Sequence, residues 1–174
     1  MIMKREKKNI YLIGFMGSGK SFVSDAMEKI YQKKKVEMDE EIQKAEGMSI
    51  SEIFRKKGES YFRALETALL CRLGKENNLV ISCGGGVPMR EENVTEMKRN
   101  GSVILLQAEP KTVYERVKDC HDRPLLEGNM NISYIAEMME KRSGRYKAAA
   151  DFTIHTDGRP AEEICREILE KIAR

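Results

Sequence analysis

A glycine-rich segment near the start of the chain has the residue types that hold phosphate groups in proteins. It reads GFMGSGKS from Gly14 to Ser21, matches G-x-x-x-x-G-K-[ST], and stands between a strand-like and a helix-like stretch. Its glycines permit a tight curl whose amides face phosphate oxygens, Lys20 can neutralise the β- and γ-phosphates, and the Ser21 hydroxyl can ligate magnesium. The segment therefore predicts a P-loop that binds a nucleotide through Gly14, Gly17, Ser18, Gly19, Lys20, Ser21 and Phe22.

A P-loop does not by itself decide a reaction, because motors, GTPases and small-molecule kinases share it. The chain has no NKxD-type segment of the kind that reads guanine, which argues against a GTPase. The residues that would contact a phosphate acceptor must therefore identify the reaction.

Three other segments carry groups suited to an acceptor. Asp39 ends the weak strand pattern KKVEMD, where a carboxylate can cap the next helix or can orient and deprotonate an acceptor hydroxyl. Arg63 can form surface pairs with Glu59 and Glu66 at helical spacing, or its planar fork can bind a substrate carboxylate. The glycines at positions 84–86 are either a flexible turn or a place where backbone amides approach a ligand closely.

The segment DCHDRPLLEGNMN at positions 119–131 has no clear period and contains Gly, Pro and Asn, so it predicts a mobile lid. Arg123 within it is either a surface charge or a lid arginine that meets the charge of a transferring phosphoryl group. Closure of such a lid would exclude water from the reaction.

The elements that must position these residues alternate between strand and helix patterns, which predicts an α/β fold with a parallel sheet of five strands and helices on both faces. Ligands then collect at the carboxyl ends of the strands. A capping box at Ser49 and Glu52 predicts a further helix start, and Gly47 a helix end before it. Strands are expected at 9–15, 34–39, 79–83, 102–108 and 151–156, and helices at 20–34, 59–76, 91–100, 110–120 and 160–173.

Length and composition favour one domain that spans residues 1–174, because 174 residues with 41% hydrophobic and 34% charged side chains suit a single core. A net charge of +3 gives no reason to expect a nucleic-acid partner, and no apolar run approaches the length of a membrane helix. The four cysteines lack metal-ligand or disulfide spacing, which fits reduced thiols in the cytoplasm. We expect a cytoplasmic monomer with a small-molecule partner.

Beyond the P-loop, the chain resembles the shikimate kinase family, and the resemblance runs from Asn9 to the last helix. The matching motifs stand in the family's order along the chain. They are EMDEEIQKAEGMSISEIFRKKGESYFRALE, ISCGGG, RPLL and EKRSGRYKAAADFTIHT.

This resemblance implies a single P-loop kinase domain with acceptor-binding helices at about residues 39–76, which transfers the γ-phosphoryl group of ATP to the 3-hydroxyl of shikimate. The catalytic residues would then be Lys20, Asp39 and Arg123. The shikimate carboxylate would be bound by Arg63 and Arg142. Phe54 and Phe62 either wall the shikimate ring or belong to the core. The acceptor hydroxyls would meet Asp39 and the amides of Gly84, Gly85 and Gly86.

The resemblance also implies contacts to ATP and Mg²⁺. Arg116 matches an arginine that stacks on adenine, and Pro160 lies near another adenine contact. Glu37 stands where the family usually has an aspartate that holds magnesium through water, and Ser82 would help to fix the same hydrated ion.

Two alternatives stay open at this point. A related kinase such as gluconate kinase also binds a polyhydroxy acid, although Arg63, Arg142, Asp39 and the glycines together favour shikimate. A nucleotide-binding module with impaired catalysis is the other alternative, because Glu37 departs from the family and Gly144 stands where the family often has proline.

Overall fold

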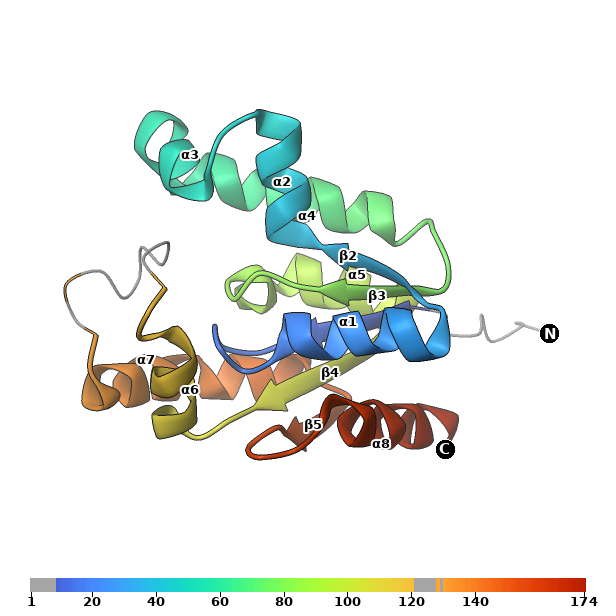
Figure 1. Ribbon diagram of the computed structural model, residues 1–174. Coiled ribbons are helices and arrows are strands. Elements are labelled where there is room, and N and C mark those ends of the chain that lie inside the picture. The colour runs from blue at the N-terminus through green and yellow to red at the C-terminus, as the bar shows by residue number, and fades with distance from the viewer. Residues whose placement is uncertain (1–8, 121–127, 129) are drawn as a thin grey trace.

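A five-stranded parallel sheet forms the centre of the computed structural model, which describes residues 9–120, 128 and 130–174 (Figure 1). The α/β fold predicted from the sequence is confirmed. β1 has β3 on one side and β4 on the other, so the strand order reverses there, and ligands bind at such places beyond the carboxyl ends of strands. The order is β2-β3-β1-β4-β5, with β1 Asn9–Ile13, β2 Lys34–Glu37, β3 Leu79–Ser82, β4 Gly101–Gln107 and β5 Phe152–His155.

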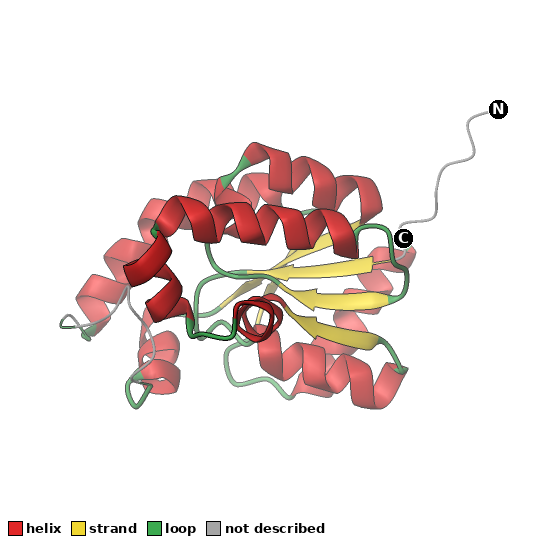
Figure 2. Cartoon of the chain, turned by 90° about the horizontal axis from the view of Figure 1, so that it is seen from above, coloured by secondary structure: helices red, strands yellow, loops and turns green. Residues whose placement is uncertain are grey.

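Helices cover both faces of the sheet, as Figure 2 shows. Successive residues of β1 face opposite sides: Ile10 and Leu12 join one core cluster, and Tyr11 and Ile13 join the other. Burial on both faces explains why the strands are apolar along their whole length. The first cluster lies under α1 Lys20–Tyr31 and α8 Ala161–Ala173, and the second under α5 Glu91–Asn100, α6 Pro110–Val117 and α7 Ile132–Ala149.

Three helices between β2 and β3 form a smaller unit with its own apolar cluster of Ile42, Ile53 and Phe62. The predicted capping box at Ser49 is present, and Gly47 ends the preceding helix with a positive φ of 65°. This unit carries Asp39 and Arg63 toward the sheet. Its helices are α2 Met38–Glu46, α3 Ile50–Lys57 and α4 Glu59–Leu73.

The predicted position of Asp39 at the end of a strand was wrong. Strand β2 ends at Glu37, which is the N-cap of α2, and Asp39 lies in the first turn of that helix. Asp39, Glu40 and Glu41 all fall in this turn, where negative charge is stabilised by the helix dipole. This electrostatic preference starts the helix earlier than the strand pattern suggests.

Several predicted helix ends were also too late. Helix α1 ends at Tyr31 because Gln32 adopts a left-handed conformation with φ of 53°, and its amide N–H bonds back to Glu28. Helix α4 ends at Leu73 and α6 at Val117, each about one turn earlier than expected. No pattern predicted α7, which has Asn131 as its N-cap and includes Gly144.

The predicted lid at positions 119–131 lies largely outside the described residues, and Arg123 lies outside them as well. In the part of the chain that the structure covers, no helix is both long and apolar enough to cross a membrane.

Candidate active site

The P-loop connects the carboxyl end of β1 to α1, where the sequence predicts it. Gly14, Gly17 and Gly19 have positive φ values of 146°, 75° and 104°, which residues with side chains rarely adopt. Lys20 Nζ donates to the carbonyl oxygens of Gly14 at 2.8 Å and Phe15 at 3.1 Å. The loop therefore combines a curled backbone with an ammonium group held across it.

The first turn of α1 supplies amides to the same site. Gly19 is the N-cap, and the first N–H groups of a helix have no acceptor within the helix itself. Ser21 and Phe22 lie in this turn, and the Phe22 ring is exposed. Amides in this position, at the positive end of the helix dipole, bind phosphate groups well.

Glu37 and Ser82 lie side by side at the carboxyl ends of β2 and β3, where they are register partners. Side chains at paired positions leave the same face of a sheet, and for this pair it is the face covered by α1. Ser24 Oγ lies 2.8 Å from Glu37 Oε1 and 3.0 Å from the carbonyl oxygen of Ser21, two acceptors for its one hydroxyl hydrogen. All these groups therefore surround the first turns of α1.

This oxygen-rich set fits a hydrated Mg²⁺ beside the Ser21 hydroxyl, because magnesium prefers oxygen ligands and keeps several waters. Among the described residues, no group of three His, Cys, Asp or Glu side chains could hold a metal ion.

The triple glycine (Gly84, Gly85 and Gly86) begins beside the P-loop. Leu12 of β1 is in register with Ser82 of β3, and the Leu12 carbonyl accepts a hydrogen bond from the Cys83 amide at 3.0 Å. Both glycine-rich segments therefore leave the centre of the sheet together.

Side chains from three helices contact the triple glycine. A Cβ atom at its first residue would lie 3.0 Å from Asp39 Oδ1 on α2, and one at its second would lie 3.1 Å from Arg142 Nη1 on α7. At the third, Gly86, a Cβ would overlap the guanidinium of Arg63 on α4. A side chain at any of the three would crowd these groups, most severely at Gly86, so the structure brings Asp39, Arg63 and Arg142 to one short piece of backbone.

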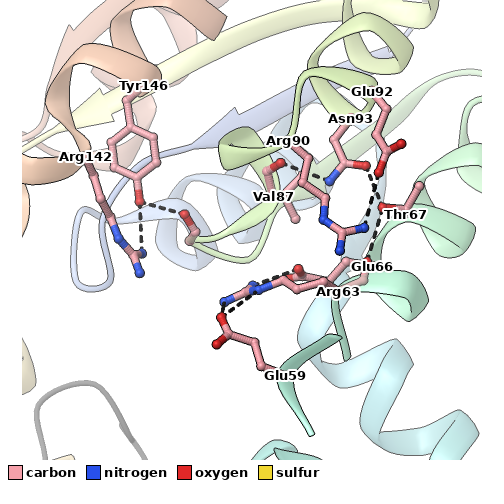
Figure 3. A network of polar contacts seen from close by, with 11 residues as sticks. Glu59, Arg63, Glu66, Thr67, Val87, Arg90, Glu92, Asn93, Arg142 and Tyr146 are labelled. Carbon is pink, nitrogen blue, oxygen red and sulfur yellow. Dashed lines mark hydrogen bonds and ion pairs between the residues drawn. The ribbon is translucent and has the colours of Figure 1, made fainter. Parts of the chain in front are cut away.

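Arg63 is held by two carboxylates and two rings. Nη1 donates to Glu66 Oε2 at 2.8 Å, and Nη2 lies 3.2 Å from Glu59 Oε1 (Figure 3). The guanidinium carbon lies 5.9 Å from the ring centroid of Phe54 and 5.3 Å from that of Phe62. Phe62 is itself buried in the cluster of α2, α3 and α4, so it supports Arg63 from within the core.

Of the two readings that the sequence left open for the partners of Arg63, the surface pair does not apply to Glu66. Its side chain is 1% exposed, and Oε1 is buried with no hydrogen-bond partner among the described residues. That atom lies 2.7 Å from where a Cβ on Gly84 would stand. Burial raises the pKa of Glu66, although Arg63 favours its charged form.

On the opposite side, Tyr146 ties α7 to the triple glycine. Its hydroxyl donates to the Gly85 carbonyl at 2.8 Å and lies 3.5 Å from Arg142 Nη1. Burial raises the pKa of Tyr146, so the phenol stays protonated and keeps its donor. Figure 3 shows Arg142 and Arg63 reaching this region from different helices.

The segment that follows the glycines is fixed by two polar side chains. Asn93 Nδ2 donates to the Val87 carbonyl at 3.0 Å, and Thr67 Oγ1 donates to Asn93 Oδ1 at 2.9 Å. This chain of bonds links α4, α5 and the short 3₁₀ helix η1 Val87–Met89. It holds the glycine backbone in place without contact to the site.

Arg116 and Pro160, predicted to contact adenine, lie at the outer edge of the P-loop. Arg116 Nη1 donates to the Gly17 carbonyl at 2.9 Å, so its guanidinium contacts the loop itself. Pro160 is the N-cap of α8, whose first helical residue is Ala161 rather than the predicted Pro160. Thr156 begins the loop between β5 and α8 and contacts Arg116 and Ser18.

Comparison with known proteins identifies the family. The model of the family described as shikimate kinase matches residues 16–173. The chain belongs to the shikimate kinase family. A protein named shikimate kinase from Persephonella marina is 47% identical over 165 residues, which are 95% of this chain and 99% of the relative.

Solved structures agree with this family. A shikimate kinase from Acinetobacter baumannii in complex with shikimate superimposes with a TM-score of 0.89 at 31% identity, over 95% of this chain and 93% of that one. A gluconokinase from Sinorhizobium meliloti reaches a TM-score of 0.60 at 22% identity, over 98% of this chain and 94% of that one, which shows a shared fold alone. The findings therefore favour the shikimate kinase family over the gluconate kinase alternative.

Sequence reasoning missed three residues that shape this site. Glu66 and Tyr146 are both part of motifs that resemble the family, so the motifs contained a signal for them. Thr156 lies immediately after β5 and is the last residue of one of the same motifs, but nothing in that motif indicates which group it contacts. Its contact with the P-loop spans 138 positions of the chain and arises only from the fold.

Proposed function

We propose that this protein transfers the γ-phosphoryl group of ATP to the 3-hydroxyl of shikimate, giving shikimate 3-phosphate and ADP. The observation that carries the proposal is the meeting of Arg63, Arg142 and Asp39 at the triple glycine, directly beside the P-loop. An anionic alcohol suits this arrangement, since two guanidinium groups can bind its carboxylate while a carboxylate orients its hydroxyl.

In this reaction the residues divide the work between the two substrates. Arg63 and Arg142 bind the acceptor carboxylate, and the amides of the triple glycine bind acceptor hydroxyls. Asp39 accepts a hydrogen bond from the attacking hydroxyl and takes its proton as the phosphoryl group is transferred. Positioning the hydroxyl in line with the γ-phosphorus supplies a large part of the rate.

On the nucleotide side, Lys20 and the amides of Gly17, Ser18 and Gly19 surround the phosphates. Charge builds up on the transferring group, and Lys20 offsets it. Bound Mg²⁺ would neutralise the phosphates, with the Ser21 hydroxyl as a ligand and Glu37 and Ser82 reaching it through water. Arg116 and Pro160 would border the adenine, and Arg123 would approach the γ-phosphate from the lid.

We also propose that the enzyme acts as a monomer in the cytoplasm. Its four cysteines, Cys71, Cys83, Cys120 and Cys165, are free thiols, which suits a reducing compartment. Size-exclusion chromatography with light scattering would test the monomer.

The deciding experiment measures ADP release by the purified protein with MgATP and either shikimate or gluconate. Release with shikimate, and mass-spectrometric detection of shikimate 3-phosphate, is the expected result. ADP release with gluconate but not with shikimate would favour the gluconate kinase alternative. No ADP release with either acid, together with tight ADP binding, would indicate a nucleotide-binding module without catalysis.

A further inference from the structure

Thr156 lies immediately after β5, on the far side of the P-loop from the acceptor residues. It is 2% exposed, and its amide donates to the Gln107 carbonyl at 2.9 Å, which fixes its backbone at the end of the sheet. Its hydroxyl donates to the carbonyl oxygen of Ser18 at 2.7 Å. A buried and rigidly mounted donor therefore holds one carbonyl of the P-loop.

The direction of that carbonyl decides the direction of an amide. The Ser18 carbonyl and the Gly19 N–H belong to one planar trans peptide group, in which the C=O and N–H bonds point in opposite directions. Because the Ser18 oxygen points toward Thr156, the Gly19 N–H points away from it. Gly19 is the residue from which α1 starts.

Arg116 holds the neighbouring carbonyl in the same way. Its Nη1 donates to the Gly17 carbonyl at 2.9 Å and lies 3.3 Å from the Thr156 hydroxyl, while Nη2 lies 3.3 Å from the Thr156 carbonyl. Two successive P-loop carbonyls are therefore drawn outward by side chains from α6 and from the end of β5. These two side chains therefore hold the backbone of the loop through its carbonyl groups.

We propose that Thr156 is a positioning residue that orients the P-loop amides for the nucleotide phosphates. This inference rests on the proposed function for its nucleotide, and it assigns the residue no contact with either substrate. Without the Thr156 hydroxyl, the peptide between Ser18 and Gly19 loses its anchor and the Ser18 carbonyl is left buried without this donor. Loss of a buried hydrogen bond of this kind corresponds to roughly tenfold in a binding constant.

The test compares Thr156→Val, which keeps the shape but removes the donor, with Thr156→Ser, which keeps the donor. Thr153→Val on β5 is the matched control. Isothermal titration calorimetry measures the dissociation constants of ADP and AMP, and steady-state kinetics measures the KM values of ATP and shikimate. We expect Thr156→Val to weaken ADP about tenfold and AMP much less, since the β-phosphate is the group that the loop amides bind.

In the same experiment, Thr156→Ser and Thr153→Val should stay within about threefold of the original protein, and the KM of shikimate should be unchanged throughout. Equal ADP affinity in Thr156→Val and the original protein would overturn the inference, and so would equal losses for ADP and AMP. If Thr156→Val fails to fold, Thr156→Ala against Thr156→Ser makes the same comparison. An original protein that binds ADP but phosphorylates no shikimate would contradict the proposed function and leave this inference intact.

Discussion

Arg63 Nη1 donates to Glu66 Oε2 at 2.8 Å, and Glu66 is almost completely buried, at 1% exposure. A carboxylate in this position is desolvated, so its interaction with the guanidinium is stronger than that of a surface pair. Glu59 pairs with the same guanidinium from solvent, with its side chain 66% exposed. The two glutamates therefore make similar contacts to Arg63 in very different surroundings.

Replacement of Glu66 by Gln should raise the KM of shikimate about tenfold and change the KM of ATP by less than twofold. The amide keeps the shape but loses the charge that orients Arg63 against the triple glycine, and a charge-assisted hydrogen bond contributes about 1.5–3 kcal/mol. Glu59→Gln is the control, with an expected change below twofold because exposed pairs contribute little. Equal effects of the two variants in steady-state kinetics would refute the distinction.

Replacement of Arg63 by Ala should lower kcat/KM for shikimate by roughly 10- to 150-fold, which is about 1.5–3 kcal/mol of lost charge-assisted contact. Arg72→Ala, on the same helix with its side chain 59% exposed, is the matched control and should have almost no effect. A loss below twofold in Arg63→Ala would exclude Arg63 from the acceptor site.

The raised pKa of Glu66 predicts a pH dependence of stability. The folded protein binds the Glu66 proton more tightly than the unfolded chain, whose carboxyl titrates near 4.5, so this group makes stability fall as the pH rises from there toward the raised folded value. At pH values below that window, Glu66 makes its full favourable contribution to the free energy of unfolding. Urea unfolding of the original protein and of Glu66→Gln should therefore show a stability difference that shifts in favour of the variant across the window.

A constant difference across that pH range would show that folding does not change the pKa of Glu66. The Glu59→Gln variant serves again as the reference, because the Glu59 side chain is largely exposed. Its stability should follow that of the original protein through this window.

Replacement of Gly144 by Ala should stabilise the protein by about 0.5–1 kcal/mol, because glycine in the interior of a helix is entropically unfavourable. Gly144 is exposed within α7, and a Cβ there would meet nothing within 4 Å. Chemical unfolding measures the gain, and kcat/KM should stay within twofold. A loss of activity would mean that Gly144 matters to the site through the motion of α7.

Much of the fold could be predicted from local patterns, because strand and helix periods, glycines and capping residues act over a few positions. The five strands and the box at Ser49 are examples. The predicted ends of elements were wrong where one local preference competed with another. Asp39 lies in the acidic first turn of α2 rather than in the strand, and α1 ends at the left-handed Gln32. Helix α7 was missed although Asn131 caps its start, and its contact between Tyr146 and Gly85 joins distant parts of the chain.

The amino-acid sequence alone determined the P-loop, because its glycines, its lysine and the start of the following helix all lie within eight consecutive residues. It also determined the family, through motifs that stand in order along the chain. Only the tertiary structure decided that Glu66 is buried, that three helices meet the triple glycine, and that Thr156 holds the P-loop. Burial and contacts across 138 positions depend on which surfaces the folded sheet brings together, and no local pattern records that.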